Sequence, residues 1–136
     1  MLAFDFGTRR IGVAVGNTLV RVAHPLATID AEASAPRFAA IAALVDEWRP
    51  GVLVVGVPVH ADGAPHEMTA RARRFARQLH GRHGLAVIEA DERHTSAAAQ
   101  SVQDASGRGG RRGRAARDAL AAQAILQAWF DEPGAR

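Results

Sequence analysis

The chain has 136 residues and a mass of 14.4 kDa, a length that predicts one domain spanning residues 1–136. It contains no cysteine, which excludes disulfides and thiolate metal sites and agrees with a reducing cytoplasm. Its 17 basic side chains are all arginine, yet the formal net charge is only +3, so any strong positive field must be local. Because Asp5 interrupts the first apolar run and no apolar stretch reaches membrane-spanning length, we expect a cytoplasmic protein without a signal peptide or membrane contact.

The N-terminal part of the chain predicts three antiparallel strands. Two short apolar runs, Leu2–Phe6 and Ile11–Gly16, are joined through a glycine-containing turn, which is typical of a hairpin. The third run, Val20–Ile29, contains Pro25, which has no main-chain donor for a strand ladder. This run is therefore predicted to be an edge strand or a strand with a break.

Helices and strands then alternate. Ser34 is expected to cap a helix, and its buried face is marked by apolar residues at three- and four-residue intervals: Phe38, Ile41, Val45 and Trp48. The run Val52–Val57 has no alternation, which is typical of a central parallel strand covered on both faces. A second helix, a strand over Leu85–Ala90, a short helix near Thr95 or Ser96 and a last helix over about 114–130 complete an α/β fold with a mixed sheet.

The first acidic residue lies inside a predicted strand. Neighbouring strand residues point to opposite faces, so Asp5 shares its face with the small residues Ala3 and Gly7 and lies opposite Phe4 and Phe6. A carboxylate removed from water needs a cation or hydrogen-bond donors. The alternative to a functional role is that Asp5 accepts hydrogen bonds from the adjacent turn.

Further acids follow at two other elements. Asp91 and Glu92 come directly after the last predicted strand, at the carboxyl end of the sheet where α/β folds bind ligands. Asp118 lies on the apolar stripe of the last helix. Each acid has a structural alternative, because acids in the first turns of a helix are stabilised by its dipole.

Three acidic positions on separate elements would repel one another in a low-dielectric site unless they share a cation. Oxygen ligands without cysteine favour Mg²⁺ or Mn²⁺ over zinc. The predicted metal ligands are Asp5, Glu92 and Asp118, with Asp91 as the alternative within its pair, and all four are predicted catalytic residues. His94 is a further candidate for proton transfer, while the other histidines are expected at the surface.

Each of these acids has arginines close by in the sequence, and guanidinium groups bind phosphodiester oxygens through forked hydrogen bonds. Those predicted to bind nucleic acid are Arg9, Arg10, Arg93, Arg111, Arg112 and Arg114. The alternative is that they are solvated charges, which is the default for the arginines at positions 71–77.

Four segments together resemble the YqgF/RuvX family of RNase H-like proteins, in the order "FDFGTRRIGVAV", "VLVVGVPVHADG", "EADERHTS" and "RDALAAQAILQAWF". The family is described as nucleases of pre-16S rRNA maturation and as Holliday junction resolvases. The resemblance implies an RNase H-like fold with a five-stranded mixed sheet, and a phosphodiester-cleaving site on Asp5, the Asp91-Glu92 pair and Asp118. RuvC-type resolvases carry an acid near the position of Gly56, so here the second ligand must come from Asp91 or Glu92.

The leading hypothesis is a metal-dependent endo- or exonuclease for the 5′ end of pre-16S rRNA in ribosome biogenesis. Two Mg²⁺ ions about 3.5 to 4 Å apart would activate water and stabilise the leaving oxygen. The alternatives are junction resolution, which would require a homodimer for symmetric cleavage, and a nucleic-acid-binding protein without catalysis. The stretch "DFGT" also resembles actin-like ATPases, but 136 residues supply only one of the two large domains needed there.

Overall fold

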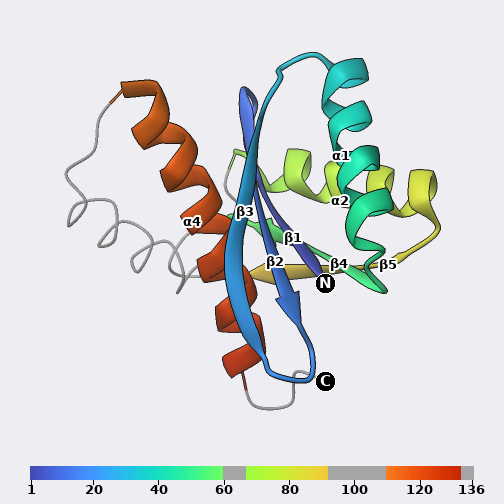
Figure 1. Cartoon of the computed structure of the whole chain (residues 1–136). Helices are drawn as coiled ribbons and strands as arrows, with labels where there is room; N and C mark the ends of the chain where they lie inside the picture. Colours follow the sequence, from blue (N-terminus) through green and yellow to red (C-terminus); the bar gives the residue numbers. More distant parts are fainter. Residues whose placement is uncertain (60–66, 92–109, 133–136) are drawn as a thin grey trace.

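The computed structural model describes residues 1–59, 67–91 and 110–132. In this part of the chain, five strands form one sheet in the order β3-β2-β1-β4-β5, with helices packed on both faces (Figure 1). The strands are β1 Leu2–Phe6, β2 Arg10–Asn17, β3 Val22–Asp30, β4 Val52–Val57 and β5 Ala86–Asp91, and the helices are α1 Ser34–Trp48, α2 Thr69–His83 and α4 Gly110–Asp131. The predicted α/β class with a mixed, RNase H-like five-stranded sheet is therefore confirmed. The short helix expected near Thr95 or Ser96 falls outside the described residues.

The sheet combines an antiparallel and a parallel half. β1 pairs with β2, and β2 with β3, in antiparallel register, whereas β4 pairs in parallel with both β1 and β5. The predicted hairpin and the parallel character of Val52–Val57 are confirmed, and Pro25 lies in β3 at the sheet edge as predicted. The expectation that Val52–Val57 is the central strand is wrong. β1 is central, because the chain leaves edge strand β3 and crosses through α1 to place β4 beside β1.

Each face of the sheet has its own apolar cluster. On one face, Leu2, Phe4 and Leu53 pack with residues of α1 and α2, among them Phe38 and Phe75. On the other face the sheet residues are smaller, and α4 packs directly onto them. They are Ala3, Ala14, Ala23 and Val54, covered by Ala122, Ile125, Leu126 and Phe130. Figure 1 shows α1 and α2 on one side of the sheet and α4 on the other.

Helix α1 differs from its prediction at both ends. Its N-cap is Ala33 and forms no side-chain capping bond, so the predicted cap at Ser34 is wrong. Phe38 and Ile41 are buried as expected, but Trp48 is 43% exposed. Trp48 is the last residue of the helix, and Arg49 then adopts the left-handed conformation with a φ of 44°. Trp48 lies on the side of α1 that the helical period predicts, but it stands at the end of the helix, where the core no longer covers it.

Two glutamines of α4 bind the main chain of edge strand β3. Gln127 accepts a hydrogen bond from the Ala23 amide at 2.9 Å and donates to the Arg21 carbonyl at 3.1 Å. Gln123 donates to the Ala23 carbonyl at 2.9 Å. These side chains satisfy edge-strand groups that would otherwise be open to pairing with another chain.

The helix surfaces away from the sheet are polar. The arginines of α2 at positions 71, 73, 74 and 77 are exposed, and Arg73 Nε lies 3.3 Å from Glu89 Oε1 of β5. This arrangement agrees with solvated charges and a surface ion pair. Among the described residues, no helix combines the length and the apolar character that crossing a bilayer requires.

Candidate active site

The side chain of Asp5 belongs to the face of the sheet that α4 covers. Ala3 packs in the α4 cluster, whereas Phe4 and Phe6 belong to the opposite cluster, so strand alternation places Asp5 with Ala3 as the sequence predicted. Asp5 pairs across β1 and β2 with Gly12, and Gly12 pairs across β2 and β3 with Thr28. Asp5, Gly12 and Thr28 therefore form one row beneath α4, with no side chain at its middle position.

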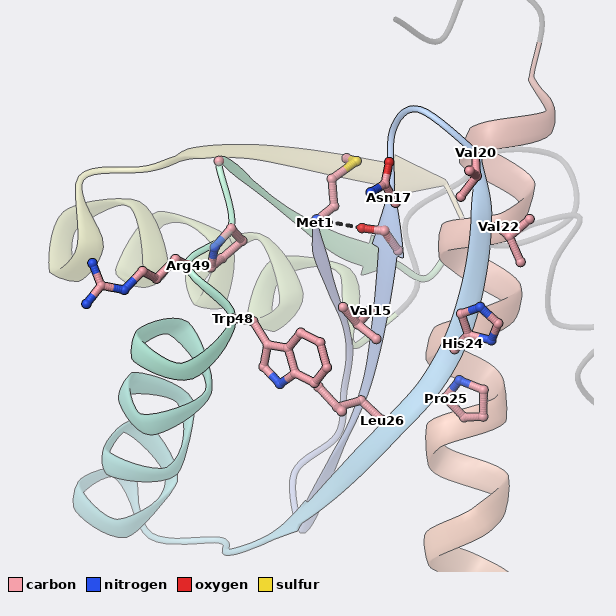
Figure 2. Close-up of a pocket in the computed structure, with 13 residues that line it drawn as sticks. Met1, Val15, Asn17, Val20, Val22, His24, Pro25, Leu26, Trp48 and Arg49 are labelled. Carbon is pink, nitrogen blue, oxygen red and sulfur yellow. Dashed lines mark hydrogen bonds between the residues drawn. The ribbon is translucent and has the colours of Figure 1, made fainter.

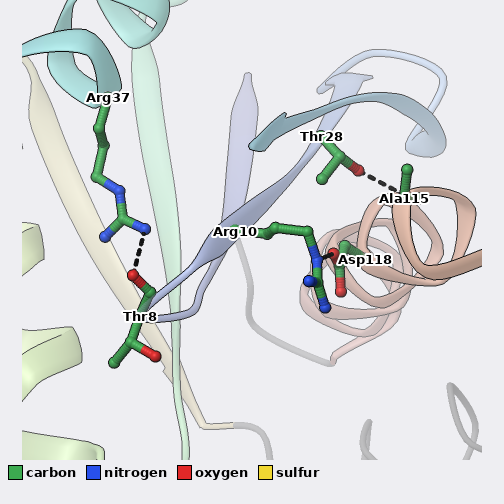
Figure 3. Close-up of polar contacts among 6 residues, drawn as sticks. All are labelled: Thr8, Arg10, Thr28, Arg37, Ala115 and Asp118. Atoms are coloured by element: carbon green, nitrogen blue, oxygen red, sulfur yellow. Dashed lines mark hydrogen bonds and ion pairs between the residues drawn. The ribbon is translucent and has the colours of Figure 1, made fainter. Parts of the chain in front are cut away.

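Gly12 allows α4 to approach the sheet at this row. A Cβ on Gly12 would lie 1.8 Å from the carbonyl oxygen of Asp118. No larger residue fits there, since backbone atoms occupy that space. In the same row, Thr28 Oγ1 donates a hydrogen bond to the Ala115 carbonyl at 2.5 Å (Figure 3). These contacts bring Asp118 over the cross-strand neighbour of Asp5, so two of the predicted acids share one face.

Asp118 is bound by the arginine that begins β2. Arg10 Nε donates to Asp118 Oδ2 at 2.6 Å, and Figure 3 shows the two side chains facing each other. The side chains are only 29% and 26% exposed, so water screens the pair in part. A charge-assisted bond of this length holds the carboxylate in a fixed orientation.

Asp91 is placed elsewhere. It ends β5 opposite Val57 and is exposed. Ile88 and Ala90 pack against the α4-side cluster, so the alternating residues Glu89 and Asp91 face the α2 side. The ion pair of Glu89 with α2 agrees with this assignment. Asp91 therefore does not join Asp5 and Asp118 on their face.

Several predicted site residues lie outside the description. Glu92, Arg93 and His94 fall in the range 92–109, and the side chains of Arg111 and Arg112 in the first turn of α4 are likewise outside it. Among the described residues, no group of three or more acids or histidines could hold a metal ion. The two carboxylates that do share a face supply only oxygen donors, a set that suits Mg²⁺ or Mn²⁺.

A polar pocket of about 460 Å³ lies next to Asp118, because Arg10, which binds Asp118, lines it. Arg9 comes from the β1–β2 turn and Arg10 from the start of β2. Thr28 and Asp30 belong to β3, and Arg114 and Ala115 to α4. Arg10 and Asp30 are also cross-strand partners. Three of the arginines predicted to bind nucleic acid are thus brought together, next to Asp118.

Sequence reasoning missed Arg37 of α1. It is 6% exposed and donates to the carbonyl oxygen of Ala31 at 2.8 Å. It also donates to the carbonyl oxygen of Thr8 at 2.9 Å, a bond that Figure 3 shows. Its guanidinium also lies 5.4 Å from the centre of the Phe6 ring. Burial lowers the pKa of Arg37 below its ordinary value, and the charge of Glu32 opposes this shift. Arg37 fixes the turn that carries Arg9 and Arg10; the only sequence signal was its place beside Phe38.

A larger hollow of about 630 Å³ lies at the other end of the sheet, between the end of α1 and the β2–β3 hairpin (Figure 2). Val15, Val22, Leu26 and Trp48 line it together with Arg49. No carboxylate is among its described lining residues, so it offers no set of metal ligands. The acids and the arginine pocket lie instead at the carboxyl end of β1, on the side where α/β sheets bind ligands.

Known proteins match this chain over nearly its whole length. The family model described as "RuvX: Holliday junction resolvase" matches residues 1–132. Three relatives carry the name "Putative pre-16S rRNA nuclease". The protein of Chromobacterium violaceum is 54% identical over 98% of both chains. The protein of Dechloromonas aromatica is 53% identical over 98% of this chain and 91% of its own length. The protein of Nitrosomonas europaea is 53% identical over 96% of this chain and 88% of its own length. The chain therefore belongs to the RuvX family.

Proposed function

We propose that the protein is a metal-dependent nuclease that hydrolyses phosphodiester bonds, with the 5′ end of pre-16S rRNA as its main substrate. The names of the curated relatives support the choice of substrate. The observation that supports the chemistry is the placement of Asp5 and Asp118 on one sheet face, with a pocket of three arginines next to Asp118. Carboxylates that would repel each other, next to a phosphate-binding lining, are the arrangement that such hydrolysis needs.

In this proposal the metal ligands are Asp5, Asp118 and Glu92. Glu92 is preferred to Asp91 because Asp91 faces the α2 side of the sheet. Bound Mg²⁺ or Mn²⁺ would supply an activated water and stabilise the leaving oxygen. Arg9 and Arg114 hold the nucleic-acid backbone through its phosphates, and Arg37 keeps the turn that carries Arg9 in place.

The family description favours a second candidate, cleavage of four-way DNA junctions. Both candidates use the same acids, because arginines bind phosphates and do not distinguish RNA from DNA. They differ in substrate and in the need for a dimer, since symmetric junction cleavage requires two active sites.

The test compares the two substrates directly. Purified protein is incubated with labelled pre-16S rRNA 5′-end fragment and with a labelled four-way junction, in Mg²⁺, in Mn²⁺ and in chelator. We expect metal-dependent cleavage of the RNA, and cleavage of the junction alone would favour resolution. Binding that persists in chelator, without cleavage of either substrate in any metal, would indicate a non-catalytic protein.

Asp5→Asn is the matched variant for this test. It removes one charge from the acidic face and preserves the shape of the side chain. We expect it to abolish cleavage while its melting temperature stays near or above that of the wild type, because the repulsion between the two carboxylates is relieved. A variant that loses its fold would instead assign Asp5 a structural role.

A further inference from the structure

Arg10 occupies a position between the two parts of the candidate active site. Its Nε binds Asp118 Oδ2 at 2.6 Å, and the same side chain lines the pocket formed with Arg9 and Arg114. Its cross-strand partner Asp30 lines this pocket as well. One guanidinium therefore adjoins both a predicted metal ligand and a cluster of phosphate-binding side chains.

The pocket suits a backbone phosphate. Its described lining contains three arginines and one aspartate, which leaves an excess of two positive charges. A volume of about 460 Å³ accommodates a phosphodiester group with part of its nucleotide. Guanidinium groups from two different elements, the β1–β2 turn and α4, can approach such a group from different sides.

Arg10 and a divalent cation would compete for Asp118. Both are positive, so a divalent ion bound to Asp118 would repel a guanidinium whose Nε lies 2.6 Å from Oδ2 and would weaken that ion pair. The side chains of the ion pair are 29% and 26% exposed, so solvent reaches both charged groups. Asp30, next to Arg10 across the strands, is placed to keep a released guanidinium inside the pocket.

We propose that Arg10 is a latch that couples the metal site at Asp118 to the arginine pocket. In the metal-free protein Arg10 neutralises Asp118. When Asp118 binds a metal ion, the Arg10 side chain turns into the pocket and binds a phosphate of the nucleic acid. Metal and nucleic acid then bind cooperatively, and the empty protein avoids an uncompensated carboxylate. This inference rests on the proposed function, because it requires Asp118 to be a metal ligand.

The first experiment is calorimetric titration of Mn²⁺ into the wild type, Arg10→Ala and Arg9→Ala. The latch predicts that Arg10→Ala binds Mn²⁺ about 3- to 10-fold more tightly, because the competing cation is gone. Arg9→Ala is the control for the general positive field of the pocket and should match the wild type within about twofold. Equal or weaker Mn²⁺ binding by Arg10→Ala would overturn the latch.

A second measurement uses the unaltered protein, so it does not depend on the variant folding. The Nε–H proton of Arg10 is followed by NMR, where its hydrogen bond to Asp118 protects it from exchange. Addition of Mg²⁺ should shift this signal and speed its exchange. A signal that stays unchanged while Mg²⁺ binds would contradict the proposal.

The coupling is measured with a fluorescein-labelled RNA hairpin carrying a single-stranded 5′ extension, in Ca²⁺ and in chelator. Wild-type affinity should rise in Ca²⁺ by about 5-fold or more. Arg10→Ala should lose most of this gain, whereas Arg9→Ala should bind more weakly in both conditions and keep the same ratio. An unchanged ratio in Arg10→Ala would refute the latch. If the ratio is unchanged but the wild type binds Mn²⁺ and cleaves RNA, the latch is wrong and the proposed function stands. If the wild type neither binds Mn²⁺ nor cleaves RNA, the proposed function is wrong as well.

Discussion

The carbonyl oxygen of Asp118 lies where a side chain at position 12 would begin, since a Cβ on Gly12 would come within 1.8 Å of it. Gly12 is also the cross-strand partner of Asp5. Because position 12 of β2 has no side chain, α4 packs directly against the sheet there. This packing puts Asp118 on the same sheet face as Asp5. The close approach is the structural basis of the candidate active site.

Gly12→Ala should therefore destabilise the protein. The new methyl group meets helix backbone, which cannot rotate away, so we expect a loss of about 3 kcal/mol in the free energy of unfolding. Gly81→Ala is the control, because nothing lies within 4 Å of its Cβ position on the exposed face of α2. That change should stabilise by about 0.8 kcal/mol through helix propensity. Urea unfolding measures both, and similar effects of the two changes would show that α4 does not pack closely at Gly12.

Arg37→Met should lower both stability and activity. The variant keeps the length of the side chain but loses its bonds to Thr8 and Ala31, at a cost of about 2 kcal/mol. Because the Thr8 carbonyl belongs to the turn that carries Arg9 and Arg10, RNA binding should weaken as well. Arg71→Met on the exposed surface of α2 is the control and should stay within about 0.5 kcal/mol of the wild type. If both variants behave alike, Arg37 does not support the turn.

The glutamines of α4 predict a graded effect on stability. Gln127→Leu removes two side-chain bonds to the main chain near the start of β3, whereas Gln123→Leu removes one. We expect losses of about 2 and 1 kcal/mol respectively, since each main-chain group left unsatisfied beneath α4 costs about 1 kcal/mol. Thermal unfolding at matched concentration gives the order. A larger loss for Gln123→Leu would contradict this account of the edge.

The sequence predicts those features that depend on local pattern. The uninterrupted apolar run at 52–57 identifies a parallel strand, and Pro25 identifies the edge strand, because each is a property of the segment itself. The alternation around Asp5 likewise gives its face correctly. These local rules hold because burial on each face repeats with the period of the strand.

Other features depend on parts of the chain that meet only in the folded protein. The exposure of Trp48 follows from where α1 ends relative to the sheet, and the burial of Arg37 from carbonyl groups on two separate segments. The acids at positions 91 and 92 were adjacent in the sequence, and only the packing of β5 showed that Asp91 faces the α2 side. The spacing of residues along the chain does not determine which distant segments come into contact in the fold.

The central claim is that Asp5 and Asp118 share divalent metal ions, and a Mn²⁺ titration of the acid variants tests it most directly. The measurement compares the wild type with Asp5→Asn, Asp118→Asn and the surface control Asp46→Asn, with circular dichroism to confirm the fold of each. We expect Asp5→Asn and Asp118→Asn each to weaken Mn²⁺ binding at least about 10-fold, because even outer-shell partners of a metal contribute that much. Asp46→Asn should bind as the wild type does. Wild-type affinity in a folded Asp5→Asn or Asp118→Asn variant would contradict the claim.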